Sequence, residues 1–131
     1  MILLDTHTWI WWNSAPEKLS KKAHQIIQQA QKESQIGITT ISCWELTMLV
    51  ARGRIGFSMD IEDWITQGLQ FPGVRLLDMT PKIAVLATRL AGTPPNDPVD
   101  RLLIATANVH AVPLLSKDEH ILKYPHVKAI W

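Results

Sequence analysis

The chain opens with MILLD, Met1–Asp5, a short apolar run that ends on a carboxylate. Four apolar residues in succession are typical of a strand buried on both faces, as strands of a parallel sheet are. Ligands of such open sheets bind in the crevice beyond the carboxyl ends of the strands. Asp5 is therefore expected at the edge of the sheet where a functional site forms.

Outward from this run, segments of strand character alternate with segments of helical periodicity. Further strands are predicted at 36–39, 74–77, 112–115 and 127–130. Helices are predicted at 6–12, 20–34, 42–53, 61–69, 80–90, 97–107 and 116–122. This alternation predicts a single α/β domain over residues 1–131, with helices on both faces of a central, mostly parallel sheet in three layers.

The composition is that of an ordinary soluble globular domain, with 47% hydrophobic and 19% charged residues. The formal net charge of +1 gives no global attraction to nucleic acid, so local patches would have to hold any polyanion. Cys43 is the only cysteine, so no internal disulfide forms, which fits a reducing cytosol. No signal-peptide pattern is present, and no apolar run approaches the roughly 18 residues of a spanning helix. A cytoplasmic protein without membrane contact is expected.

Four acidic residues fall where the predicted topology brings strand ends and helix starts together. Asp5, Glu45 and Asp118 each follow a predicted strand closely, and Asp100 joins them if its helix begins at the same edge. Gathering carboxylates costs free energy through like-charge repulsion, and a divalent cation removes that cost. Mg²⁺ prefers such oxygen ligands, and metal-activated water attacking a phosphodiester is the chemistry that this arrangement favours.

Helix capping is the competing interpretation of three of these acids. Ser42 and Glu45 match a capping box, in which Glu45 bonds back to the Ser42 backbone. Asp97 with Asp100 matches an N-cap followed by an acid that stabilises the helix dipole, and Ser116–Glu119 resembles a capped helix start. Asp5 has no obvious capping pattern. Recurrence at one edge favours a shared site, but position alone leaves both interpretations open.

Four blocks of sequence resemble the motifs of PIN-domain nucleases. They are LLDTH at 3–7, ISCWEL at 41–46, DPVDRLLIA at 97–105 and LLSKD at 114–118. They occur in the family's order and span nearly the whole chain. The length and the third block are similar to those of the VapC-like toxins of bacterial toxin–antitoxin pairs.

The resemblance implies a PIN-like fold and an endoribonuclease that depends on Mg²⁺ or Mn²⁺. Asp5 and Asp100 would be direct metal ligands, Asp118 a ligand directly or through water, and Glu45 a ligand or the group that orients the attacking water. Ser116 would support the site by hydrogen bonding, and Asp97 would be a helix cap or a secondary ligand. Thr6 and Arg101 would be further supporting residues of the site. Water attack on phosphorus would leave a 3′-hydroxyl and a 5′-phosphate.

The resemblance also implies partners. Family members usually form homodimers and are inhibited by a cognate antitoxin, whose C-terminal segment lies across the active-site groove. One position departs from the pattern, because Pro95 stands where relatives with this third block often carry a histidine.

Two rival functions remain at this point. A haloacid-dehalogenase-like phosphatase also begins with a strand that ends in Asp, but its second acid is expected where His7 stands. A non-catalytic binding module would keep the fold and lose the metal.

The tryptophans admit several roles. Trp9, Trp11 and Trp12 make the first helix apolar nearly all round, which predicts core packing for at least one. The others would contact a partner or, as a weaker alternative, stack on RNA bases. Trp44 and Trp64 are predicted to lie in the core or an interface, and Cys43 is predicted to be a small buried apolar residue.

Overall fold

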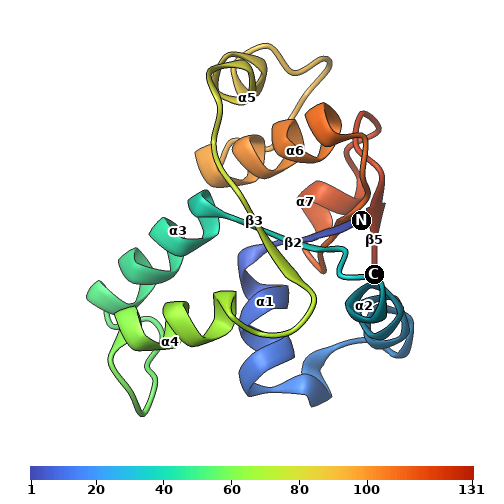
Figure 1. The fold of residues 1–131 in the computed structure, drawn as a ribbon. Coiled ribbons are helices and arrows are strands. Elements are labelled where there is room, and N and C mark those ends of the chain that lie inside the picture. The colour runs from blue at the N-terminus through green and yellow to red at the C-terminus, as the bar shows by residue number, and fades with distance from the viewer.

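Strand β1 (Ile2–Leu4) lies in the middle of a five-stranded sheet in the computed structural model, which describes all 131 residues (Figure 1). The strand order is β3-β2-β1-β4-β5, and every neighbouring pair is parallel. The other strands are β2 (Ile36–Thr39), β3 (Val74–Leu77), β4 (Leu114–Leu115) and β5 (Ala129–Ile130). The predicted α/β class with a parallel sheet is confirmed.

Helices cover both faces of this sheet. They are α1 (Thr6–Ser14), α2 (Lys21–Lys32), α3 (Thr40–Ala51), α4 (Ile61–Leu69), α5 (Pro81–Ala87), α6 (Pro98–His110) and α7 (Glu119–Leu122), with a short 3-10 turn at Pro16–Lys18. In Figure 1, α5 and α6 lie above the sheet, whereas α1 and α4 lie below it. The three predicted layers are present.

The alternation of side chains along β1 explains the two cores. Ile2 and Leu4 pack into one buried cluster, which includes residues of α1, α2 and α4. Leu3 points to the opposite face and packs with residues of α6 and α7. Since successive side chains of a strand face opposite ways, an all-apolar strand suits a sheet covered on both sides. A smaller cluster joins α5 to the outer side of α6.

The aromatic residues divide between the core and the surface. Trp9 is fully buried and packs edge to face against the buried Trp64, with ring centroids 5.1 Å apart, so core packing is confirmed for both. Trp44 is 59% exposed, so a core position is wrong for it. Cys43 is only partly buried, at the margin of the first cluster.

Several element boundaries differ from the predicted ones. α3 begins at Thr40, and the Thr39 hydroxyl accepts the Ser42 N–H at 3.0 Å, so the predicted helix start at Ser42 is wrong, and so is the rival interpretation of Ser42 and Glu45 as a capping box. α7 is capped by Asp118 and not by Ser116. α1 runs two residues further than predicted, and α5 stops at Ala87. No helix is long and apolar enough to span a membrane.

Candidate active site

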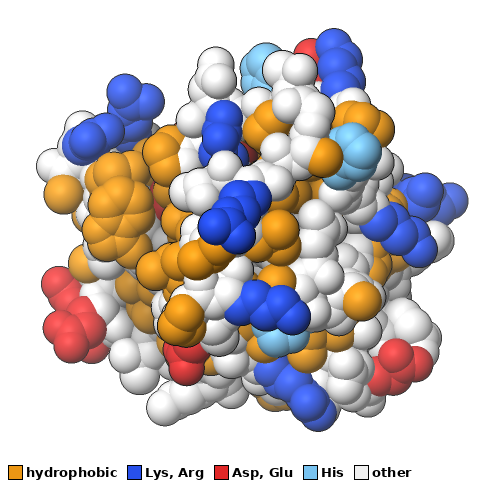
Figure 2. Space-filling view, turned by 90° about the horizontal axis from the view of Figure 1, so that it is seen from above, with side chains coloured by type: hydrophobic (Ala, Val, Ile, Leu, Met, Phe, Trp, Pro, Cys, Tyr) orange, Lys and Arg blue, Asp and Glu red, His pale blue; other side chains and the backbone are white.

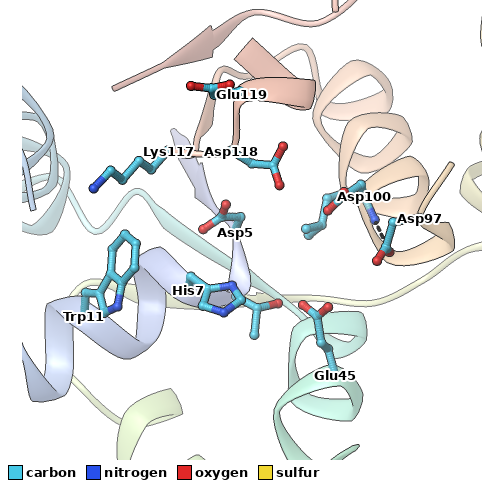
Figure 3. Close-up of a pocket in the computed structure, with 11 residues that line it drawn as sticks. Asp5, His7, Trp11, Glu45, Asp97, Asp100, Lys117, Asp118 and Glu119 are labelled. Atoms are coloured by element: carbon cyan, nitrogen blue, oxygen red, sulfur yellow. Dashed lines mark hydrogen bonds between the residues drawn. The ribbon is translucent and has the colours of Figure 1, made fainter. Parts of the chain in front are cut away.

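The order of the strands places a crevice beside β1. The chain runs from β1 to β2 and β3 on one side, and then returns to β4 and β5 on the other. Such a switch point opens a crevice at the carboxyl ends of the two diverging strands. A pocket of about 410 Å³ is found there (Figure 3). Its lining residues are Asp5, Thr6, His7, Trp11, Glu45, Asp97, Asp100, Leu103, Lys117, Asp118 and Glu119.

Asp5 occupies the floor of this pocket at the junction of β1 and α1. It is only 7% exposed, and its backbone N–H donates to the Leu115 carbonyl of β4 at 3.2 Å. Its Oδ1 accepts the Thr8 N–H at 2.8 Å and so caps α1. The expectation that Asp5 has no capping role is therefore wrong. A carboxylate has two oxygens, so the second can still serve the pocket.

Asp97 and Asp100 come from the start of α6. Asp97 Oδ1 caps the helix by accepting the N–H groups of Val99 at 2.7 Å and Asp100 at 3.2 Å, as the N-cap interpretation predicted. Asp100 lies in the first turn of α6 and also lines the pocket. The pKa of Asp100 is raised to about 7, mostly by burial and in addition by the nearby charges of Asp97, Asp118, Glu45 and Asp5. The other four carboxylates are therefore close enough to Asp100 to act on it electrostatically.

Asp118 reaches the same pocket from the turn between β4 and α7. Its Oδ1 accepts the N–H of His120 at 2.8 Å and of Ile121 at 3.3 Å. The fully buried Ser116 hydroxyl accepts the Asp118 N–H at 3.1 Å. Ser116 does not line the pocket itself, but it fixes the backbone from which Asp118 projects.

Glu45 completes the set from the second turn of α3. Burial raises its pKa most, the charges of Asp97 and Asp5 add to the rise, and a hydrogen bond with Thr6 and the charge of His7 oppose it. The Thr6 hydroxyl also donates to Ser42 Oγ at 3.0 Å. Because a hydroxyl has one proton, it can donate to Glu45 only if Ser42 donates in turn to Thr6.

No cation neutralises these acids inside the protein. The only ion pair of the chain joins Lys123 to Glu119 at 3.9 Å, on an exposed surface. Lys117 is the one Lys or Arg among the lining residues, and it does not pair with a carboxylate. No three His, Cys, Asp or Glu side chains form a ready-made metal-ligand group. The carboxylates therefore converge on one pocket, as expected, but without the close chelating geometry that the sequence led us to expect.

Most of the predicted site residues meet in this pocket. Asp5, Glu45, Asp100 and Asp118 line it together with Asp97 and Thr6. Arg101 does not line it, and its Nε instead donates to the Pro95 carbonyl at 2.7 Å.

Sequence reasoning did not assign five of the lining residues to a pocket: His7, Trp11, Leu103, Lys117 and Glu119. Two signals could have found some of them. Lys117 and Glu119 flank Asp118 in the chain, and the four-residue spacing of His7 and Trp11 puts them on one helix face next to Asp5.

Comparisons with known proteins give the family. The PIN domain model matches residues 2–127. Ribonuclease VapC22 of Mycobacterium tuberculosis is 33% identical over 129 residues, which is 98% of this chain and 95% of that protein.

Two solved structures share the fold. VapBC2 from Rickettsia felis, bound to a DNA fragment from its promoter, has a TM-score of 0.72 at 15% identity, covering 99% of this chain and 98% of the other. A toxin–antitoxin complex from Klebsiella pneumoniae has a TM-score of 0.66 at 18% identity, covering 100% and 97%. The match of the PIN domain model over residues 2–127 and the 33% identity to Ribonuclease VapC22 show that the chain belongs to the PIN-domain family and is VapC-like.

Proposed function

We propose that this chain is a divalent-metal-dependent endoribonuclease, the toxin of a toxin–antitoxin pair. The observation that carries the proposal is the convergence of Asp5, Glu45, Asp97, Asp100 and Asp118 on one pocket without a neutralising cation. Burial first, and the charges of the neighbouring acids second, raise the pKa of Asp100, and a bound cation would offset the free energy cost of keeping these carboxylates ionised together. The 33% identity to Ribonuclease VapC22 supports RNA as the substrate.

The residues present fit Mg²⁺ or Mn²⁺ better than a softer metal. The pocket offers carboxylate oxygens, and the only imidazole that lines it belongs to His7. Mg²⁺ keeps several waters and takes one or two protein carboxylates together with substrate phosphates, so a closed protein cage is not required. Asp5, Asp100 and Asp118 would hold the ion, which would supply a Lewis acid for the scissile phosphate and the attacking water.

The chain's own groups would divide the remaining work. Glu45 would orient the attacking water, and its raised pKa suits it to take a proton. The oxygen of that water would form a bond to phosphorus as the bond to the 3′ oxygen breaks. Glu45 would take the proton that the water loses, and the departing 3′ oxygen would take a proton from solvent, which leaves a 3′-hydroxyl and a 5′-phosphate. Asp97 and Ser116 would fix the positions of Asp100 and Asp118 through the backbone contacts described above.

The proposed partners follow from the same relatives. A cognate antitoxin would inhibit the enzyme in the cytoplasm, as the toxin–antitoxin neighbour from Klebsiella pneumoniae suggests. A homodimer would cover part of the exposed apolar surface, which includes Trp44 at 59% and Val85 at 48% exposure. Figure 2 shows Lys and Arg side chains scattered among hydrophobic ones on the face above α5 and α6.

Cleavage of a labelled RNA mixture tests the proposal. We expect cleavage with Mg²⁺ or Mn²⁺, none with EDTA, and products that carry a 5′-phosphate. Mutation of the residues that hydrogen-bond to metal ligands typically lowers activity about 10- to 100-fold. Loss of a ligand itself should cost more, so Asp100→Asn and Asp5→Ala should each lower the cleavage rate about 100-fold or more. Asp78→Asn is the matched control, since Asp78 is exposed, also follows a strand, and lies outside the pocket.

The same assay separates the rival functions. Cleavage of RNA that survives in Asp5→Ala, or in EDTA, would refute the metal-dependent enzyme. A folded protein that cleaves no RNA under any condition and still binds an antitoxin would be a binding module. The PIN domain match over residues 2–127 favours a nuclease over a phosphatase, and a phosphomonoester substrate in parallel checks this directly.

A further inference from the structure

One wall of the acidic pocket is aromatic and cationic. Trp11, on α1, lines the pocket, and Lys117 lines it from the turn before α7. In Figure 3 both lie on one side of Asp5, whereas Asp97 and Asp100 lie on the other. Trp11 is partly buried, and Lys117 is exposed. A flat ring and a mobile positive charge therefore stand beside the place where we propose that phosphate is cleaved.

The Trp11 ring is held in place by its neighbours. Trp131 packs against it at 66°, with centroids 5.8 Å apart, and His7 lies 6.0 Å away at 55°. Neither contact is a parallel stack. The Lys117 ammonium lies 5.9 Å from the ring centroid, above the ring. An aromatic side chain that is already fixed loses little conformational entropy when a planar group stacks on it.

We propose that Trp11 and Lys117 form a nucleobase subsite, in which a base next to the scissile bond stacks on Trp11 and Lys117 contacts an adjacent phosphate. This inference rests on the proposed function, because it names how the same site binds single-stranded RNA. Every base has a π-face, so stacking on an aromatic ring serves RNA binding without fixing the sequence. The exposed Lys117 side chain can move from the ring to a phosphate oxygen as the base arrives.

The charge of Lys117 favours a nucleotide over a basic protein side chain. An arginine that stacked on Trp11 would place its positive charge next to the Lys117 ammonium, which lies above the same ring. A nucleotide instead brings a neutral base and a negative phosphate. Lys117 is also the one Lys or Arg lining a pocket that is otherwise acidic, so it is the natural contact for a phosphate there.

RNA binding by the wild-type protein and by three variants, Trp11→Leu, Trp11→Phe and Trp12→Leu, tests the subsite. The probe is a labelled single-stranded RNA of about ten nucleotides, followed by fluorescence anisotropy in Ca²⁺, with a gel to verify that the RNA stays intact. Trp11→Leu should weaken binding about tenfold or more, whereas Trp11→Phe should retain most of it. Trp12→Leu is the matched control, because Trp12 is the next residue of α1, is also partly buried, and packs on Phe71 away from the pocket.

An abasic series identifies stacking itself. One nucleotide at a time is replaced by an abasic one, and we expect a position where wild-type protein loses about tenfold in affinity. At that position Trp11→Leu should lose nothing further, since the two changes remove the same contact. Lys117→Gln should reduce the steepness of the plot of log affinity against log salt concentration by about one. Lys22→Gln, a change at an exposed lysine outside the pocket, should leave that slope unchanged.

The results separate this subsite from the nuclease proposal. Equal weakening by Trp11→Leu and Trp12→Leu, or abasic losses that are the same in wild type and Trp11→Leu, overturns the subsite even if Mg²⁺-dependent cleavage is observed. Absence of RNA binding also overturns it. Binding that depends on Trp11 and on one base, without cleavage in Mg²⁺ or Mn²⁺, supports the subsite and overturns the nuclease.

Discussion

Asp100 is the pocket carboxylate whose pKa is raised most clearly, by burial and by the charges of its neighbours. Its pKa is about 7 in the folded protein against 3.8 for an isolated aspartate, so the folded state holds a proton that the unfolded chain releases. The stabilisation is present at low pH and is lost as pH rises from about 4 to about 7. In EDTA, the free energy of unfolding should fall across that window, and Asp100→Asn should remove part of the fall.

Urea denaturation at pH about 5 and about 8 measures this difference. The matched control is Asp78→Asn, which removes a carboxylate outside the pocket. Its free energy of unfolding should fall between the two pH values by as much as that of the wild type. The result that counts against the argument is a parallel fall in wild type and Asp100→Asn.

Single carboxylates also show where reasoning from sequence was too simple. Capping and site membership were weighed as alternatives, yet Asp5, Asp97 and Asp118 each cap a helix and line the pocket. Both roles hold because an N-cap uses one carboxylate oxygen and leaves the other. The cap also fixes the side chain, so the two roles support each other.

The packing of α1 against α4 depends on a glycine. A Cβ on Gly68 would lie 3.1 Å from Cζ2 of Trp9, which is fully buried and packed on Trp64. Alanine is normally favoured over glycine in a helix by about 1 kcal/mol. Because the Trp9 ring is fully buried and packed on Trp64, we expect overpacking of about 1–3 kcal/mol to outweigh that gain.

Gly68→Ala is therefore expected to lower the free energy of unfolding by up to about 2 kcal/mol, the difference of those two effects. Chemical denaturation measures it. Gly56→Ala is the control, since a Cβ there meets nothing within 4 Å, and it should be neutral or slightly stabilising. If Gly68→Ala is more stable than wild type, Trp9 can shift and the packing argument fails.

The sequence predicted which segments are helices and which are strands better than it predicted the residues at which they begin and end. Short, mainly apolar segments predicted all five strands, and β1 was the clearest of them because a strand covered on both faces needs no polar alternation. The start of α3 was misplaced because Thr39 and Ser42 are both capable N-caps, and in the fold Thr39 is at once the last residue of β2 and the N-cap of α3. The 3-10 turn at Pro16–Lys18 left no periodic signal, since three residues are too short to show one.

The pocket as a whole required the order of the strands, which the sequence did not contain. Asp78 follows β3 as Asp5 follows β1, and both stand at the same edge of the sheet. β3 is the outermost strand, however, whereas β1 borders the switch point, so only Asp5 lines the pocket. The resemblance to PIN-domain nucleases selected acids that share one pocket because it carried this three-dimensional information, which spacing alone did not.

Metal binding by the whole molecule should depend on substrate. The lining carboxylates do not form a ready-made group of three ligands, and Mg²⁺ or Mn²⁺ ordinarily completes its shell with waters and phosphate oxygens. Mn²⁺ is therefore expected to bind the protein weakly alone. A single-stranded DNA oligonucleotide, checked on a gel to remain intact, should tighten Mn²⁺ binding by about tenfold, or about 1.4 kcal/mol of coupling.

Electron paramagnetic resonance of free Mn²⁺ measures both affinities. By linkage, Mn²⁺ must tighten oligonucleotide binding by the same factor, which anisotropy checks independently. Asp100→Asn should lose both the metal and the coupling, and Asp78→Asn should keep them. If Mn²⁺ binds wild type equally tightly with and without the oligonucleotide, the carboxylates alone complete the metal site, and substrate phosphate is not one of its ligands.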